Sequence, residues 1–203
     1  MNFEKPDYKI TEYVENNFYG KFELEPLERG FGLTLSNALR RVMLSSMPGS
    51  AIVAVKIDGV MHEFQTIEGV IEDVTAIILN LKGVVIRNHS DEVKTAHLSV
   101  KGEKEVTAAD IECDPDIEII NKDQVIATLA KGGKLDMEFI IANGRGSAMS
   151  SENKKYITDA SLGYIPIDAN YSPIELVVPS VEKTRVGQDA SYDKLIMEVQ
   201  TTT

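Results

Sequence analysis

Two segments of the chain repeat apolar residues with the period of an amphipathic helix. The first repeat places five apolar residues at steps of three and four: Leu35, Ala38, Leu39, Val42 and Met43. This spacing predicts that they share one face of a helix. Gly30 and Gly32 precede the segment, Thr34 is a candidate N-cap, and Pro48-Gly49 ends it.

The second segment is longer and more strongly apolar. Its repeat consists of Ile67, Val70, Ile71, Val74, Ile77, Ile78 and Leu81. Thr66 is a candidate N-cap, and Glu68 suits the positive amino-terminal end of a helix dipole. Lys82-Gly83 suits the carboxyl-terminal end. The pattern therefore predicts a helix over 67–81.

Most of the remaining chain has the pattern of β-strands. Two runs alternate clearly, Val53, Val55 and Ile57 in one and Leu135, Met137, Phe139 and Ile141 in the other, and the second predicts a sheet face that is wholly apolar. Shorter strand-like runs cover 21–24, 84–87, 97–100, 124–129, 174–178 and 195–199. Many strands with only two strong helices indicate an α+β fold rather than a regular βαβ alternation.

Length and charge restrict the class of function. At 203 residues the chain is long enough for a hydrophobic core without metal or disulfide support. Its 32 acidic and 21 basic residues leave a net charge of −11. A protein that binds DNA without sequence preference needs surplus Lys and Arg to displace counterions from the phosphates. We therefore expect no direct DNA binding.

The chain carries no sign of export. Its single cysteine, Cys113, has no partner for an internal disulfide. The first residues are polar and lack the apolar stretch of a signal peptide. No apolar run reaches the roughly 18 to 20 residues that a membrane-spanning helix needs. We expect a cytoplasmic location and no membrane contact.

Two acidic or histidine-containing patterns resemble parts of metal sites. His62-Glu63 begins like a zinc-protease motif, but no second histidine follows at the fourth position. Asp114, Asp116 and Glu118 alternate along a segment that we expect to be extended. Their carboxylates would form a solvated acidic edge or, alternatively, hold Ca²⁺ or Mg²⁺. We favour the acidic edge and predict no metal ligand.

Two glycine-containing segments resemble parts of anion sites. Gly30-Phe31-Gly32 lacks the third glycine of a dinucleotide-binding fingerprint. The amides of 143–146 could hold an anion, but the segment follows an apolar strand and a hairpin turn is the favoured interpretation. We expect 144–155 to be an exposed loop. The sequence predicts no catalytic residue and no cofactor.

The first predicted helix carries apolar residues outside its main face. Leu44 and Met47 lie off that face, close to Arg40-Arg41. A helix with two apolar faces buries both of them, either inside its own chain or against another chain. The spacing alone leaves both alternatives open.

Four long blocks carry a family resemblance that spans nearly the whole chain. They are LEPLERGFGLTLSNALRRVMLSS (24–46), IDGVMHEFQTIEGVIEDVTAIILNLKG (57–83), IPIDANYSPIELVV (165–178) and VEKTRVGQDASYDKLIMEV (181–199). In this order they resemble the amino-terminal domain of the bacterial RNA polymerase alpha subunit.

The resemblance implies a two-part α+β fold and a function in assembly. A discontinuous dimerisation subdomain would comprise 1–48 and 174–203, and an inserted β-rich subdomain would comprise 49–173. The domain would form a homodimer on which the beta and beta-prime subunits of DNA-directed RNA polymerase assemble. It would perform no chemistry itself, use no cofactor, and reach the nucleoid only through the polymerase complex.

The resemblance also implies roles for individual residues. Seven residues match family positions at partner surfaces: Phe31, Leu35 and Leu39 at the dimer interface, Arg41 and Leu44 against beta, and Lys82 and Ile167 against beta-prime. An arginine beside an apolar side chain is a common interface anchor, because it offers a planar charged donor next to a desolvated patch.

The chain departs from the family pattern locally and at its end. Ser36, Ser147 and Pro179 stand where the family often has glycine, tyrosine and tyrosine. The family continues past the 193–199 strand into a second dimer helix, a linker and a DNA- and activator-binding domain. We therefore expect residues 1–203 to dimerise more weakly than a longer chain.

Two other classes of function compete with this interpretation. One is a metal-dependent hydrolase that uses Asp114, Asp116 and Glu118. The other is an acidic adaptor domain unrelated to transcription.

Overall fold

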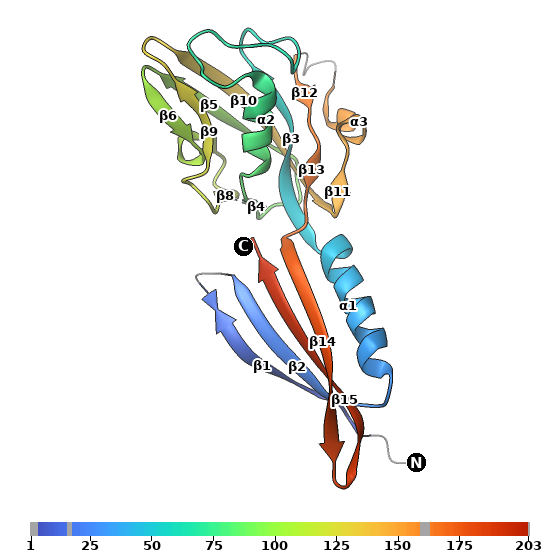
Figure 1. Cartoon of the computed structure of the whole chain (residues 1–203). Helices are drawn as coiled ribbons and strands as arrows, with labels where there is room; N and C mark the ends of the chain where they lie inside the picture. Colours follow the sequence, from blue (N-terminus) through green and yellow to red (C-terminus); the bar gives the residue numbers. More distant parts are fainter. Residues whose placement is uncertain (1–3, 16–17, 159–162, 203) are drawn as a thin grey trace. The chain divides into compact units, whose positions relative to one another are not determined.

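The structure is a computed structural model that describes residues 4–15, 18–158 and 163–202. The chain divides into two compact units. The terminal unit combines both ends of the chain, Met1–Met47 and Ser172–Thr203, and the inserted unit is the continuous segment Pro48–Tyr171 (Figure 1). The first helix and the last two long strands belong to the terminal unit, and the second helix belongs to the inserted unit.

The terminal unit is an antiparallel sheet with one long helix. The strand order is β1 (Asp7–Val14), β2 (Tyr19–Leu27), β15 (Asp189–Thr201) and β14 (Ile174–Val186). Helix α1 (Phe31–Ser46) packs on β14 and β15 (Figure 1). The core between them contains Leu27, Val177, Leu195 and Met197, each at most 4% exposed.

The buried face of α1 is only partly the predicted one. Leu35, Leu39 and Met43 pack against the core as predicted. Gly32 and Ser36 are the buried residues of the helix, whereas Ala38 and Val42, which the spacing placed on the core face, are exposed. The reason is close approach: a Cβ on Gly32 would lie 2.7 Å from Val181 Cγ1. Small residues let the helix lie directly on the sheet, and hydrophobic periodicity does not recognise them as core.

The start of α1 also differs from the prediction. The helix begins at Phe31, with Gly30 at the N-cap position in the left-handed region at φ 88°. Thr34 therefore lies inside the helix, and its hydroxyl donates to the Gly30 carbonyl at 3.4 Å. The prediction that Thr34 caps the helix is wrong.

The inserted unit is built on a larger antiparallel sheet. Its strand order is β7 (Glu112–Cys113), β5 (Lys94–Lys101), β10 (Lys134–Arg145), β3 (Pro48–Ile57), β4 (Ile86–Asn88) and β8 (Ile117–Ile119), with β12 (Ile165–Pro166) also paired to β3. Smaller pairs join β6 (Lys104–Thr107) to β9 (Val125–Leu129) and β11 (Ser147–Ala148) to β13 (Ala169–Asn170). The helical elements are α2 (Val74–Lys82), α3 (Ser150–Asn153) and the 3₁₀ turns Ala108–Asp110 and Lys154–Tyr156.

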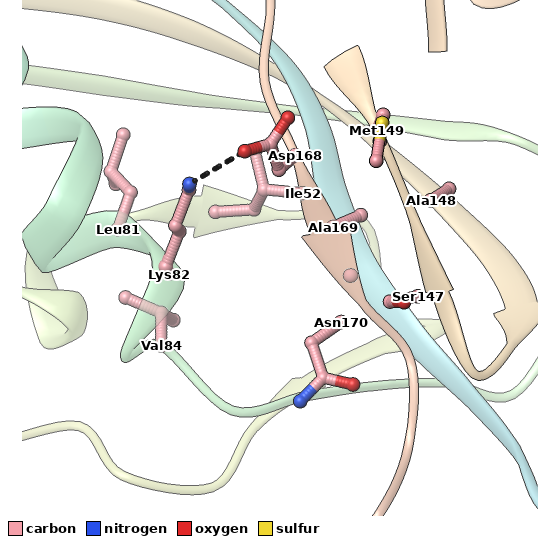
Figure 2. Close-up of a pocket in the computed structure, with 11 residues that line it drawn as sticks. Ile52, Leu81, Lys82, Val84, Ser147, Ala148, Met149, Asp168, Ala169 and Asn170 are labelled. Atoms are coloured by element: carbon pink, nitrogen blue, oxygen red, sulfur yellow. Dashed lines mark hydrogen bonds and ion pairs between the residues drawn. The ribbon is translucent and has the colours of Figure 1, made fainter. Parts of the chain in front are cut away.

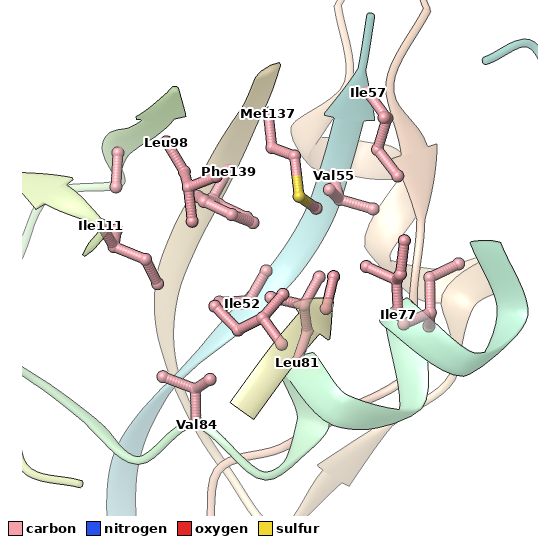
Figure 3. Packing of buried hydrophobic residues seen from close by; sticks show 14 of the residues in the cluster. Ile52, Val55, Ile57, Ile77, Leu81, Val84, Leu98, Ile111, Met137 and Phe139 are labelled. Carbon is pink, nitrogen blue, oxygen red and sulfur yellow. The ribbon is translucent and has the colours of Figure 1, made fainter. Parts of the chain in front are cut away.

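Both faces of the large sheet are covered. Helix α2 packs its Ile77 and Leu81 against one face, in the core that Figure 3 shows. The opposite face carries a second core that includes Ala142 and Tyr171. As a result Val53, Ala54 and Val55 are each 0% exposed, so the simple alternation predicted for this run is wrong. A strand covered on both sides reads as a continuous apolar run.

The remaining strand predictions agree with the structure. The predicted apolar residues of β10, from Leu135 to Ile141, are each at most 1% exposed and face one core. Ile140, on the opposite face, packs in the other core. A register shift against β3 follows it, because Ile140 pairs with Ala54 and Ile141 pairs with Ile52. All six shorter strand-like runs overlap strands. The α+β class is confirmed.

Helix α2 is shorter than predicted. It begins at Val74 and not near Ile67, and Asp73 caps it by accepting a hydrogen bond from the Ala76 amide at 2.7 Å. The preceding residues pair with the end of β9 instead, because the Ile71 amide donates to the Thr128 carbonyl at 3.0 Å. Ile71 is consequently 73% exposed. The predicted Thr66 N-cap is wrong.

The predicted turn and loop after β10 are also wrong. Strand β10 continues through Asn143 and Gly144 to Arg145, paired with β3 throughout. Gly144 lies under the Tyr171 ring, where a Cβ would come within 2.6 Å of the ring. The segment predicted as an exposed loop contains β11 and α3, and its Asn153 is 0% exposed.

Among the described residues, no helix combines the length and the apolar character that crossing a membrane requires.

Candidate functional site

Helix α1 presents apolar side chains to solvent as well as to its sheet. Phe31, Leu35 and Leu39 follow one another at steps of four, which places them along one line of the helix. Phe31 is 53% exposed. Leu35 and Leu39 are half-buried and pack against the core of the terminal unit. The three predicted dimer residues therefore lie in one row, with Phe31 exposed to solvent and Leu35 and Leu39 at the edge of the core.

The sheet of the terminal unit continues this apolar character on the side where α1 packs. Tyr8 pairs with Leu24 and Ile10 pairs with Phe22, and these partners pair in turn with Leu195 and Met197 of the core. Directly paired residues share a face of the sheet, so β1 presents its aromatic and aliphatic side chains on the helix side. Three of them are exposed by about two thirds: Tyr8 (69%), Ile10 (69%) and Tyr13 (70%).

We call these residues, with Phe31 and Val42 of α1, the open apolar face. Its members are each 53% to 70% exposed. Single exposed apolar residues are common on soluble proteins, whereas several on one side of one sheet mark an interaction surface.

Arg41 and Leu44 have different surroundings on α1. Arg41 is exposed, and its backbone carbonyl accepts a hydrogen bond from Ser45 Oγ at 2.6 Å. Leu44 is half-buried and packs against the same core as Leu35 and Met43. Leu44 thus takes part in folding, and its predicted contact with another chain would use the part of its surface that remains exposed.

Lys82 pairs with Asp168, the residue that follows Ile167 in the sequence. Lys82 ends α2, and its Nζ lies 3.2 Å from Asp168 Oδ2 (Figure 2). The Ser150 amide donates to the other carboxylate oxygen at 2.8 Å. These bonds, the amide first and Lys82 second, hold the pKa of Asp168 below its usual range. Ile167 itself is 3% exposed and belongs to the core.

A cavity of about 340 Å³ adjoins this ion pair. Its apolar wall includes Ile52, Leu81, Ala148 and Met149, and Lys82 and Asp168 lie at the same site (Figure 2). Met149 is 70% exposed. The cavity therefore combines apolar lining with one cation and one anion, a surface suited to an apolar side chain with polar neighbours.

The acidic run is arranged differently from the prediction. Asp114 and Asp116 lie in a turn between β7 and β8, where the Asp114 carboxylate accepts the Asp116 amide at 3.0 Å. Lys94 Nζ lies 3.0 Å from Asp116 and 3.6 Å from Asp114. Glu118 pairs instead with His89 at 3.0 Å. No cluster of three or more His, Cys, Asp or Glu with metal-binding geometry occurs in the described ranges.

Cys113 is half-buried beside this turn, and burial raises the pKa of its thiol. A raised pKa lowers the fraction of reactive thiolate at neutral pH.

One buried acidic residue, Asp193, has no recognisable signal in the sequence. It is 3% exposed on β15, and its Oδ2 accepts the Gly30 amide at 2.8 Å and the Gly32 amide at 3.3 Å. Lys183 Nζ lies 2.6 Å from Oδ1. The Lys183 hydrogen bond first, and the two amides after it, hold the pKa of Asp193 below its usual range. The Gly30-Phe31-Gly32 segment thus binds a carboxylate of its own chain.

The chain is similar to proteins of one family along almost its entire length. The family model described as "RNA polymerase Rpb3/RpoA insert domain" matches residues 55–172. The DNA-directed RNA polymerase subunit alpha of Symbiobacterium thermophilum is 53% identical over 201 residues, and that of Oceanobacillus iheyensis is 51% identical over the same length. Each match covers 99% of this chain and 63% of the relative.

The architecture defines a class: an α+β protein in which a β-rich unit is inserted between two ends that fold together. The chain belongs to the RNA polymerase Rpb3/RpoA insert domain family, and its relatives are DNA-directed RNA polymerase alpha subunits. The resemblance seen in the four sequence blocks is confirmed. The chain spans 63% of the length of the curated relatives it matches.

Proposed function

We propose that this chain is the assembly part of an alpha subunit of bacterial DNA-directed RNA polymerase. In this function it forms a homodimer and recruits the beta and beta-prime subunits, as a non-catalytic component of a nucleotidyltransferase complex. The identity of 51% to 53% over nearly the whole chain supports the subunit assignment. No cofactor is needed for this function, because its work is done by protein contacts.

The open apolar face is the observation that carries the dimer proposal. Its residues lie on the helix side of the terminal sheet, and an apolar surface of this kind is stabilised by removal from water. A second copy of the chain would cover it with the same residues, as the two-fold symmetry of a homodimer requires. The terminal unit is therefore the proposed dimerisation subdomain, with Phe31, Leu35 and Leu39 at the interface.

The proposed contacts with the large subunits lie on two other surfaces. Arg41 and the exposed part of Leu44 would contact beta. Lys82 and the adjoining cavity would contact beta-prime, with Ile167 acting from within the core by holding Asp168 in place. The inserted unit and α1 would thus provide protein-binding surfaces rather than a site for chemistry.

Reconstitution from purified subunits tests the proposal. The full-length subunit of the source bacterium is mixed with beta and then with beta-prime, and the masses of the complexes are measured by sedimentation. We expect a dimer first, then a complex with beta, then a complex with both. The variant Phe31→Ser should weaken the dimer. The matched control is Val93→Ser, which replaces an apolar residue of similar exposure (51%) on the inserted unit and should leave the dimer intact.

A wild-type chain that remains monomeric at concentrations well above those in the cell, and that captures neither large subunit, would contradict the proposal. Tight stoichiometric binding of a divalent cation in calorimetry would instead favour the competing hydrolase hypothesis, with Asp114, Asp116 and Glu118 as ligands.

A further inference from the structure

An acidic side chain far away in the sequence closes the amino-terminal end of α1. Asp193 lies 163 positions from Gly30, and its Oδ2 accepts the backbone amides of both Gly30 and Gly32. Its other oxygen accepts a hydrogen bond from Lys183 Nζ at 2.6 Å. With 3% of its surface exposed, the carboxylate is bound inside the terminal unit.

The helix lacks a cap of its own. Gly30 occupies the N-cap position and has no side chain that could accept a hydrogen bond from the helix amides. The first turn of α1 contains no acidic residue. The free amides at a helix start need acceptors, and the positive end of the helix dipole favours a negative charge there. Asp193 supplies both from the adjacent strand, and hydrogen bonds to an ionised acceptor are stronger than neutral ones.

The contact holds the backbone on both sides of a proposed interface residue. Phe31 lies between the two glycines whose amides donate to Asp193. Its side chain is 53% exposed. A Cβ at Gly32 would lie 3.1 Å from the Asp193 Cβ, which shows how closely the helix start lies against β15.

We propose that Asp193 is a positioning residue for the homodimer, because it anchors the start of α1 and thereby sets where Phe31 and the exposed stripe of the helix meet a second copy of the chain. This inference rests on the proposed function. It assigns the orientation of the dimer helix to a residue of β15 that is itself only 3% exposed.

The matched substitution is Asp193→Asn in the full-length chain. Asparagine has the same shape as aspartate but is uncharged, and its NH₂ group is a donor where aspartate has an acceptor oxygen. That NH₂ group would therefore face another donor, either Lys183 Nζ or the two backbone amides. The control is Asp189→Asn on the same strand, whose exposed carboxylate accepts the nearby Ser191 amide at 2.8 Å. A further variant, Lys183→Gln, leaves the Asp193 carboxylate on the two amides.

Two measurements are made on each variant: the dimer dissociation constant by sedimentation equilibrium, and residue-resolved amide hydrogen exchange. For Asp193→Asn we expect a dimer weakened by about ten-fold or more, equivalent to about 1.4 kcal/mol. We also expect exchange in the first turn of α1 to quicken by a similar factor, with little change in β2 and α2. Asp189→Asn should match the wild type, and Lys183→Gln should lie between.

The outcomes are distinguishable. Unchanged dimerisation and unchanged exchange in α1 for Asp193→Asn would overturn the positioning role. Faster exchange throughout the terminal unit would also overturn it, because the residue would then act on general stability. If the wild type does not dimerise, the proposed function fails, and exchange in α1 still decides whether Asp193 anchors the helix.

Discussion

Arg41 and Leu44 are separated by less than one turn of α1, yet their surroundings differ. Leu44 packs against the core of the terminal unit, whereas Arg41 is exposed to solvent. The sequence left open whether Leu44 belongs to the core or to an interface. The structure assigns part of its surface to the core, so a substitution there affects folding as well as any partner.

We expect Leu44→Ala to lower the free energy of unfolding by about 2 kcal/mol, at the low end for a leucine because the side chain is only half-buried. Arg41→Ala should change it by less than about 0.5 kcal/mol, because the residue is exposed. Thermal unfolding of the isolated domain measures both. If Leu44→Ala leaves the melting temperature unchanged, Leu44 contributes nothing to the core.

Arg41→Ala is then the cleaner probe of the proposed contact with beta. We expect it to weaken capture of beta by about 2 kcal/mol, the usual size for a central interface anchor. A pull-down titration against purified beta measures the loss. Arg40→Ala, an adjacent exposed arginine, is the matched control, and an equal loss in both variants would mean that the effect is general electrostatics.

Helix α2 begins later than predicted because the residues before it make other backbone contacts. The predicted first turn pairs with β9 and with the β9–β10 turn, where the Ala130 amide donates to the Gly69 carbonyl at 2.8 Å. Gly69 has φ +77°, and a Cβ there would lie 2.7 Å from the Gly133 Cα. Two backbones meet at this point, and a helix through Gly69 would lose that contact.

We expect Gly69→Ala to lower the free energy of unfolding by about 3 kcal/mol, since it combines an unfavourable positive φ with a backbone clash. Gly132→Ala is the matched control: it also has a positive φ, +81°, but a Cβ there meets nothing within 4 Å. Its cost should be about 1 kcal/mol. Denaturant unfolding compares the two, and equal losses would show that the approach of Gly133 is unimportant.

At the scale of the whole molecule, five aspartates within the described ranges have a pKa held below its usual range: Asp110, Asp136, Asp168, Asp189 and Asp193. Asp136, for example, is held by Lys134 and Ser99. Because the pKa of each group is lower in the folded than in the unfolded chain, the unfolded chain takes up protons at a higher pH than the folded chain does. Stability from these groups is therefore complete above the ordinary aspartate pKa of about 3.9 and is lost as the pH falls through the lower folded values.

We expect the melting temperature to fall steeply as the pH is lowered from about 5 to about 3. Asp136→Asn should be less stable at neutral pH and should lose less on acidification, since the asparagine takes up no proton there. Calorimetric scans across the pH range measure both. A melting temperature of the variant that falls in parallel with the wild type would contradict a contribution from Asp136.

The net charge of −11 leads to a further expectation for the whole chain. Duplex DNA should bind with no measurable affinity at physiological salt, because there is no surplus of Lys and Arg to release counterions. Fluorescence anisotropy with a labelled duplex measures this. Micromolar binding at moderate salt would contradict the expectation.

The sequence by itself determined the class, the family and the buried face of one strand. In β10 that face could be predicted, because strict alternation places Leu135, Met137, Phe139 and Ile141 on one side whatever covers it. The four blocks were long enough to identify the family without any structure. These features depend on local spacing and residue identity, which the sequence contains in full.

Tertiary structure alone decided the features that depend on residues distant in the chain. Gly32 and Ser36 are core because α1 lies against β14 and β15, and Val53 and Ala54 are buried because a second core covers the other face of the sheet. The Asp193 anchor and the Lys82–Asp168 pair join residues 163 and 86 positions apart. Hydrophobic periodicity reports which side of an element is apolar, but burial and hydrogen bonding depend on what packs against it, and that is fixed only when the whole chain folds.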